Sequence, residues 1–219
     1  MSNHPSDLLP ALQQGIAALG LTLDAQQQNK LLRYIELLVQ WNKVYNLTAV
    51  RNPAEMLTHH VLDSLSVIAP LRRHTQGKAV QLLDVGSGGG LPGVVIAICC
   101  PEVQVTCVDA VAKKTAFIQQ VAGVLALPNL QARHARVETI TTPHHIITSR
   151  AFASLADFTQ WSAAALAPDG AWMAMKGKHP DDEIAALPAS VRVAHTETLQ
   201  VPGLNAERCL VWMEAESKS

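Results

Sequence analysis

The sequence predicts an α/β fold, in which a mostly parallel sheet is preceded by a helical extension. From about residue 78 onward, short apolar runs typical of strands alternate with helix-like runs. This order is typical of parallel strands joined by right-handed crossovers. The residues before that point carry helical patterns only, and these helices are too few and too short to be convincing as an independent domain. We therefore expect residues 1–75 to be an extension that packs on a core made by residues 76–219.

Three helices are predicted in the extension, over residues 7–19, 24–45 and 53–69. Gly20 is placed to end the first helix. The second helix has one apolar face at helical spacing, made by Leu31, Ile35, Leu38 and Val39. At the start of the third helix, Asn52 can cap, Pro53 suits the first turn and Glu55 can reach back to the cap.

The elements of the core follow in order along the chain. Strands are predicted at 79–83, 103–109, 130–134, 146–149 and 171–175, with helices at 91–100, 111–125, 155–166 and 181–187. The tail is interpreted as two further strands, at 190–198 and 208–214. In open α/β sheets, ligands bind at the carboxyl ends of the strands. Polar residues at those ends are therefore the first candidates for a functional site.

The glycine-rich stretch at 81–93 is the strongest local signal. A strand-like run ends at Asp84, glycines follow at positions 86, 88, 89 and 90, and an apolar helix-like run begins at Leu91. Glycines allow positive φ and close approach of a ligand, and the start of a helix offers free N–H groups. Gly86 and Gly88 are therefore expected to receive a nucleotide or nucleoside.

Two acids indicate which kind of ligand binds there. Asp84 comes just before the first glycine, where it would compete with a pyrophosphate but would suit a cation such as the ammonium and sulfonium of S-adenosylmethionine (SAM). Asp109 ends the next strand, where a carboxylate can accept hydrogen bonds from ribose hydroxyls. The ordered set of strand, acid, glycines, helix, strand and acid predicts a nucleoside-type cofactor.

Composition and charge narrow the possible partners. The 17 basic and 18 acidic residues give a net charge of −1, so no global positive field indicates a nucleic-acid partner. Any RNA contact must come from local basic clusters, at 72–74, 113–114, 133–136 and 176–179. The chain has no signal-peptide pattern and no apolar run of membrane-spanning length, so we expect a soluble cytoplasmic protein.

Cysteine and histidine patterns argue against disulfides and metals. The four cysteines lie in apolar runs without C-x-x-C spacing and are interpreted as reduced core residues. Side chains of the adjacent histidines at 59–60 and 144–145 diverge, and there is no H-E-x-x-H motif. We therefore expect no metal.

Several motifs in one order resemble the class I methyltransferases, and in detail the RsmG (GidB) family of small-subunit ribosomal RNA guanine-N7 methyltransferases. The likeness covers nearly the whole chain and rests on segments 41–49, 60–65, 84–93, 149–152, 176–177 and 207–208. The resemblance implies a class I SAM-dependent methyltransferase (Rossmann-like) fold whose last strand is antiparallel. It also implies 16S rRNA or the small ribosomal subunit as the partner. We expect the chain to act as a monomer.

The resemblance also implies roles for individual residues. Gly86 and Leu91 would line the SAM site, Val137 and Glu138 would flank the adenine, and Arg150 would close the pocket. It places Asn46 and His60, together with Asp63, near the cofactor or the RNA. Trp41 is interpreted as a structural aromatic residue, paired with Tyr45 at helical spacing.

The implied reaction is displacement of the SAM methyl group by N7 of one guanine in the 530-loop region of 16S rRNA. N7 carries a free lone pair at neutral pH, so no general base is needed. The absence of an Asp/Asn-Pro-Pro-Tyr motif and of an activated cysteine agrees with this reaction. Catalysis would rest on proximity and alignment. Candidates for holding RNA phosphates or the guanine O6 are Lys113, Arg136, Arg150 and Lys176.

The sequence departs from the family pattern in two places. His144 and His145 stand where an acidic residue usually precedes the strand that ends in Ser149 and Arg150, which bears on the geometry around Arg150. His59 stands where a longer basic residue is common, which bears on a possible RNA contact.

Two other interpretations stay open. A nicotinamide-dependent oxidoreductase would use the same kind of sheet, but Asp84 before the glycines and the lack of a Tyr-x-x-x-Lys pair argue against it. A non-catalytic SAM-binding protein associated with RNA would carry the same glycine loop. Substitution of Arg150 and Lys176 would distinguish it, because an enzyme loses turnover even when both ligands still bind.

Overall fold

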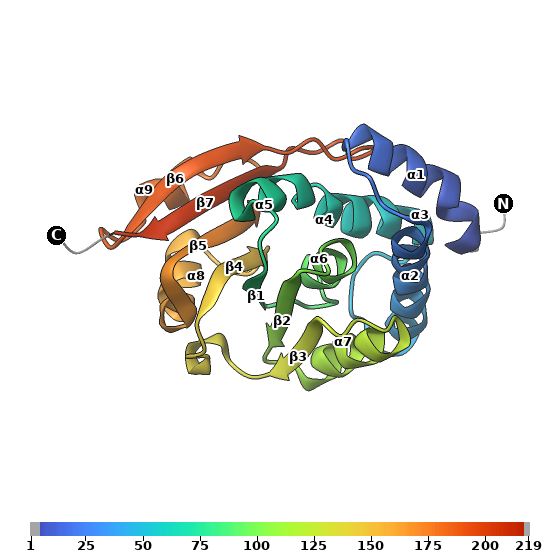
Figure 1. Ribbon diagram of the computed structural model, residues 1–219, viewed down its shortest axis with the longest axis horizontal. Helices are drawn as coiled ribbons and strands as arrows, with labels where there is room; N and C mark the ends of the chain where they lie inside the picture. Colours follow the sequence, from blue (N-terminus) through green and yellow to red (C-terminus); the bar gives the residue numbers. More distant parts are fainter. Residues whose placement is uncertain (1–4, 217–219) are drawn as a thin grey trace.

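The computed structural model describes residues 5–216, which form a seven-stranded sheet with helices packed on both faces (Figure 1). The strands lie in the order β3-β2-β1-β4-β5-β7-β6. Their bounds are β1 Val80–Val85, β2 Val103–Asp109, β3 Leu130–His134, β4 His144–Arg150, β5 Leu166–Lys176, β6 Val191–Thr198 and β7 Cys209–Ala215. β1 to β5 pair in parallel, whereas β7 runs antiparallel to both β5 and β6. The predicted sheet, mostly parallel with an antiparallel last strand, is confirmed.

The chain enters the fold through helices. A short 3-10 turn, η1 (Pro5–Leu8), leads into α1 (Leu9–Ala18), and α2 (Ala25–Tyr45) follows. Asp24 caps α2 in a capping box, since its side chain accepts from the Gln27 N–H at 2.7 Å and the Gln27 side chain accepts from the Asp24 N–H at 3.1 Å. α2 ends at Asn46, whose φ of 50° is left-handed.

The third predicted helix is interrupted. It consists of α3 (Pro53–Met56), the π-helical turn η2 (Leu57–Leu62) and α4 (Asp63–Leu65), and after Ser66 it continues as α5 (Ile68–Thr75). The Ser66 hydroxyl donates to the Asp63 carbonyl at 2.6 Å, which competes with the regular helix hydrogen bond. The wide turn of η2 carries His60 and leads directly to Asp63, and π-helical turns often accompany functional sites.

The core helices are α6 (Gly93–Cys99), α7 (Ala112–Val124), α8 (Leu155–Ser162) and α9 (Asp181–Ala185), with 3-10 turns η3 (Val137–Thr139) and η4 (Ala163–Ala165). The helix predicted over 155–166 is shorter than expected, and β5 begins at Leu166 instead of 171. Between its pairing with His144 and its pairing with Ile146, β5 carries an irregular stretch with Pro168, Asp169 at φ 60°, and Gly170. Pro-Asp-Gly is typical of a turn, so the sequence did not indicate a strand beginning before it.

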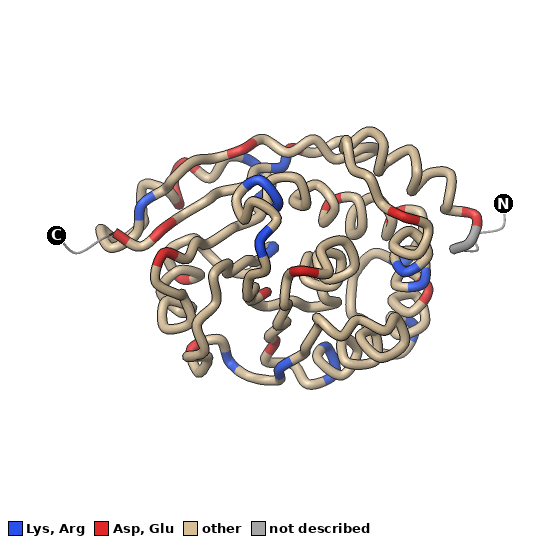
Figure 2. The backbone as a smooth tube through the Cα atoms, in the orientation of Figure 1, with Lys and Arg blue, Asp and Glu red and all other residues tan. Residues whose placement is uncertain are grey.

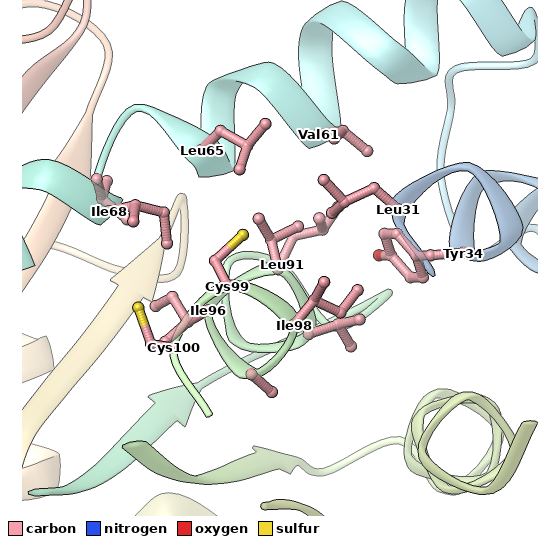
Figure 3. Packing of buried hydrophobic residues seen from close by; sticks show 14 of the residues in the cluster. Leu31, Tyr34, Val61, Leu65, Ile68, Leu91, Ile96, Ile98, Cys99 and Cys100 are labelled. Carbon is pink, nitrogen blue, oxygen red and sulfur yellow. The ribbon is translucent and has the colours of Figure 1, made fainter. Parts of the chain in front are cut away.

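One hydrophobic cluster joins the N-terminal helices to the sheet. Figure 3 shows α6 surrounded by residues of α2, η2, α4 and α5, among them Leu31, Tyr34, Val61, Leu65 and Ile68. Every residue of α6 is buried, as expected for a helix that is apolar on all sides. The N-terminal helices therefore share their core with the sheet.

A second cluster covers the opposite face of the sheet. Successive strand side chains point to opposite faces, so Leu82 joins the first cluster while Leu83 packs in the second, with Phe158 of α8. The connection between β6 and β7 runs toward the N-terminal helices (Figure 1), where Gly203 faces Thr58.

The cysteines and the helix lengths bear on two expectations from the sequence. All four cysteines are buried and free, as predicted, and burial raises the pKa of each thiol. Among residues 5–216, every helix is too short or too polar to cross a lipid bilayer.

Candidate functional site

The glycine-rich turn between β1 and α6 lies at the centre of the candidate site. Gly86 and Gly88 have φ of 66° and 57°, a left-handed conformation that glycine adopts without strain. The Gly86 N–H donates to the Val108 carbonyl at 2.9 Å, and the Tyr34 hydroxyl of α2 donates to the Gly89 carbonyl at 2.6 Å. The N-terminal helices therefore help to shape the turn, a role for Tyr34 that the sequence did not indicate.

Asp84 lies beneath this turn and lines none of the cavities described below. Its side chain is fully buried, and its Oδ2 accepts from the Gly93 N–H at 2.9 Å, at the start of α6. Its Oδ1 has no partner among residues 5–216. Burial raises the pKa of Asp84 to about 7, and the Gly93 hydrogen bond acts in the opposite direction. The predicted direct contact with a cationic ligand is thus corrected, because Asp84 instead fixes the turn against α6.

Asp109 at the end of β2 organises the neighbouring strand end. Its Oδ2 accepts from the Gly88 N–H at 3.0 Å and its Oδ1 from the Val111 N–H at 2.9 Å. The Lys114 Nζ lies 3.6 Å from Oδ2. The prediction named Lys113, which is exposed and lies outside the cavities described here. The side chain one position along a helix is rotated by about 100°, so Lys114 and not Lys113 reaches Asp109.

A first cavity of about 470 Å³ opens at the carboxyl ends of the strands. Its wall combines apolar side chains with the predicted residues Gly86, Asp109, Arg136, Val137 and Glu138. Phe152 and Trp161 close one side, with their rings edge to face at 5.9 Å between centroids. An acid beside apolar walls is the kind of surface that suits a ribose and a base.

A second, smaller cavity of about 140 Å³ lies over the glycine turn and shares Gly86 with the first. Its wall includes the predicted residues Gly88, Leu91, His60 and Arg150. Leu47 and Thr48 line its other side, from a loop that the buried Asn42 holds. The Asn42 Nδ2 donates to the Val50 carbonyl at 3.0 Å, and the Thr48 N–H donates to Oδ1 at 2.9 Å.

Of the two predicted substrate residues, His60 lines the second cavity, and Asn46 is not part of the wall of the first or the second. Its Nε2 lies 2.8 Å from the Thr48 hydroxyl. Burial, and then the charge of Arg150, lowers the pKa of His60 to about 4, so its imidazole is neutral at pH 7. Asn46 is exposed at the end of α2, where its Oδ1 accepts from Arg51 at 2.6 Å.

A third cavity of about 490 Å³ lies on the side of β4 and β5, and it shares His60 and Arg150 with the second. The Arg150 Nη1 donates to the His59 carbonyl and to the Asp63 Oδ2, both at 2.9 Å. The Asp63 Oδ1 accepts from the Arg208 Nε at 2.8 Å.

Arg208 was not among the predicted site residues, although one signal could have found it. Because β7 is antiparallel, its start lies at the same edge as the ends of the parallel strands, and Cys209 pairs with Lys176. Arg208 directly precedes that start.

Lys176, a predicted catalytic residue, is engaged elsewhere. Its Nζ donates to the Ala153 carbonyl at 2.9 Å and lies 3.0 and 2.7 Å from the two carboxylate oxygens of Glu183. Glu183 in turn accepts from the Leu155 N–H at 2.7 Å, at the start of α8. An ammonium has three N–H groups, and these three acceptors match them. Lys176 lines the third cavity, as expected of a site residue, and its ammonium group also fastens β5 to α8 and α9.

Basic residues and histidines outside the three cavities lie on many separate segments of the chain. Figure 2 shows Lys and Arg on many separate segments. His144 and His145 begin β4, at the opposite end of the strand from Arg150. A strand rises about 3.3 Å per residue, so these two histidines, which depart from the family pattern, lie far from the cavities. Across residues 5–216, no group of three or more His, Cys, Asp or Glu side chains is placed to hold a metal ion.

The fold and the site together define a class of protein. A solved structure of TrmN from Thermus thermophilus is similar to this chain, with a TM-score of 0.57, 17% identity, and coverage of 73% of this chain and 53% of that one. A SAM-dependent methyltransferase from Thiobacillus denitrificans, solved with S-adenosylhomocysteine, gives a TM-score of 0.52 at 11% identity, covering 68% of this chain and 90% of that one. The fold is that of class I SAM-dependent methyltransferases, as the sequence predicted.

The particular family follows from the sequence relatives. The model of the GidB family, rRNA small subunit methyltransferase G, matches residues 27–211. Proteins named ribosomal RNA small subunit methyltransferase G are 64% identical over 211 residues in Acidovorax ebreus, covering 93% of each chain, and 58% identical over 221 residues in Polaromonas naphthalenivorans, covering 99% of this chain and 100% of that one. This chain belongs to the GidB family, and the predicted resemblance is confirmed.

Proposed function

We propose that this chain transfers the methyl group of SAM to N7 of one guanine in 16S rRNA, in the 530-loop region, by direct displacement without a general base. The observation that carries the proposal is the row of three adjoining cavities at the carboxyl ends of the strands. Gly86 is common to the first two cavities, and His60 and Arg150 are common to the second and third. Membership of the GidB family supports small-subunit rRNA as the acceptor.

The residues of the first two cavities fit SAM. Asp109 offers carboxylate oxygens to a ribose, while Val137 and Phe152 offer apolar surface to an adenine. The second cavity has the size of an amino-acid moiety, and Arg150 lies on its wall. When bound, SAM supplies an electrophilic methyl group on a cationic sulfur.

The third cavity fits the acceptor nucleotide. Its volume of about 490 Å³ has room for a nucleotide, and it meets the second cavity at His60 and Arg150. Methylation at N7 moves a positive charge onto the guanine ring. A protonated histidine at this junction would add to the opposing charge of Arg150, and the burial that keeps His60 neutral avoids this. The residues align the two reactants, and N7 needs no base.

The test is transfer of a labelled methyl group from SAM to small ribosomal subunits and to naked 16S rRNA, both from cells that lack this protein. Chemical cleavage at N7-methylguanine then locates the product. We expect one labelled and cleavable guanine in the 530-loop region. SAM binding without label in either RNA would contradict the proposal and favour a non-catalytic SAM-binding protein. Label that resists this cleavage would contradict the N7 assignment alone.

A further inference from the structure

A buried carboxylate joins three distant parts of the chain at the third cavity. Asp63 belongs to α4, Arg150 ends β4, and Arg208 precedes β7. The Asp63 side chain is only 2% exposed, and its two oxygens accept from the two arginines at 2.9 and 2.8 Å. The arginines lie 87 and 145 residues away from it in sequence. Only the folded chain brings these groups together.

The two arginines keep donors for a ligand. Arg150 uses its Nη1, while Arg208 uses its Nε for Asp63 and its Nη1 for the Glu207 carbonyl at 2.8 Å. Within the part of the chain that the structure describes, the Nη2 of each arginine has no protein acceptor. A guanidinium carries five N–H donors. Both side chains line the third cavity and are about one-fifth exposed, at 21% and 22%.

The charge of this group favours an anion. Two arginines and one carboxylate leave a net charge of +1, and the neighbouring Lys176 and Glu183 balance each other. Without Asp63, the two guanidinium groups would repel each other and turn toward solvent. With it, each guanidinium donates one hydrogen bond to a different oxygen of the same carboxylate. The N–H groups that remain can donate to phosphate oxygens.

We propose that Asp63 is a positioning residue that holds Arg150 and Arg208 as a two-arginine site for a phosphate of the RNA strand that carries the acceptor guanine. The inference rests on the proposed function, since the phosphate belongs to the acceptor RNA. A phosphate suits this site better than the guanine ring does, because the ring becomes positively charged on methylation and two arginines would oppose that charge.

The first experiment measures binding of 16S rRNA to wild-type and variant chains over a range of salt concentrations. R208Q and D63N are each expected to weaken RNA binding about tenfold. In a plot of the logarithm of the RNA-binding constant against the logarithm of salt concentration, each variant should have a slope about one unit less steep than the wild type. This is the amount expected for one lost phosphate contact. R208Q should leave SAM affinity unchanged, because Arg208 lines neither the first nor the second cavity. R192Q is the matched control, since Arg192 of β6 is also paired with a carboxylate, that of Glu214.

A double variant shows whether Asp63 acts through the arginines. If it does, D63N combined with R208Q weakens RNA binding by less than the product of the two single effects. A purely structural Asp63 would lower thermal stability and leave the salt dependence of RNA binding as in the wild type. If D63N fails to fold, R208Q alone decides through its salt dependence. Wild-type salt dependence in R208Q overturns the phosphate site.

Comparing RNA binding with methylation distinguishes a failure of the phosphate site from a failure of the proposed reaction. If R208Q and D63N weaken RNA binding as expected but the wild-type chain forms no N7-methylguanine, the phosphate site is supported and the reaction is overturned. Methylation that proceeds with R208Q and D63N at wild-type KM for RNA and wild-type kcat would overturn the phosphate site alone.

Discussion

At the scale of single residues, the site depends on positions where few side chains fit. Gly86 has a left-handed backbone, and a Cβ added there would lie 2.2 Å from the Phe152 ring. Asp84 is buried, and its Oδ1 has no hydrogen-bond partner among residues 5–216. His60 is buried at the junction of two cavities. These residues lead to two predictions.

Gly86→Ala is expected to lower the free energy of unfolding by roughly 2–4 kcal/mol, from left-handed strain and from the clash with Phe152. SAM affinity should fall at least about tenfold, because the first two cavities meet at this residue. Urea denaturation and calorimetric SAM titration measure the two effects. Gly20→Ala is the control for strain alone, since its φ is 65° and no atom of the described residues lies within 4 Å of an added Cβ. SAM binding by Gly86→Ala at wild-type affinity would contradict the role of the turn.

Asp84→Asn is expected to change how stability depends on pH. The pKa of Asp84 is raised from 3.8 to about 7 in the folded chain. Between those values the folded state holds a proton that the unfolded state releases, so this contribution to stability is present at low pH and lost as pH rises through 7. The difference between these two pKa values corresponds to a change in unfolding free energy of up to roughly 4 kcal/mol.

The quantity to measure is the unfolding free energy of the wild type minus that of Asp84→Asn, from urea denaturation between pH 4 and 8. The difference is needed because His60, whose pKa is lowered from 6.5 to about 4, contributes stability that is lost as pH falls through that range. Asp182→Asn, at an exposed position of α9, serves as the control. Parallel profiles for the wild type and Asp84→Asn would rule out a raised pKa.

At the scale of elements, the loop between α2 and α3 is as important as any helix. It has no regular structure, yet it lines the second cavity through Leu47 and Thr48. Its shape comes from the Asn42 side chain, which satisfies two of its backbone groups. A loop with buried polar backbone needs such partners.

Asn42→Ala is expected to lower the free energy of unfolding by about 2–3 kcal/mol, because the Thr48 N–H and the Val50 carbonyl lose their partners. Hydrogen exchange of residues 47–50 should become faster than in the wild type, and SAM affinity should fall. The control is Asn205→Ala, an exposed asparagine in the connection before β7, which should change stability by less than about 0.5 kcal/mol. Unchanged exchange in the loop would contradict the proposed support by Asn42.

At the scale of the whole molecule, the N-terminal helices are part of the core. They cover the buried α6 (Figure 3). They also anchor the glycine turn through Tyr34 and supply Asp63 to the third cavity. A chain limited to residues 76–219 would expose the apolar surface of α6 to water, and burial of apolar surface is the main driving force for folding.

Residues 76–219 alone are therefore expected to show no cooperative thermal transition by calorimetry and no SAM binding. Addition of residues 1–75 as a separate chain should restore part of both, because the two pieces contain all of the shared core. The full-length chain under the same conditions is the reference. Cooperative unfolding of 76–219 with SAM bound would show that the extension is dispensable for the core.

Much of this protein followed from the sequence by itself. Local patterns predicted the order of strands and helices, the turn at 84–93 and its neighbouring acid Asp109, because periodicity, glycine spacing and strand ends are local properties. Trp41 is the structural aromatic residue that was predicted, since its ring lies tilted against those of Tyr45 and Phe117, with 4.9 and 5.4 Å between ring centroids.

Only the tertiary structure decided which polar residues meet. It pairs Lys114 with Asp109, pairs Lys176 with Glu183, and buries Asp84 beneath the turn. It also brings Arg208 to Asp63, 145 residues away in sequence. The physical reason is that a side chain's direction and partners depend on helix phase, strand direction and packing. These are set by contacts between segments far apart in the chain, and no local pattern records them.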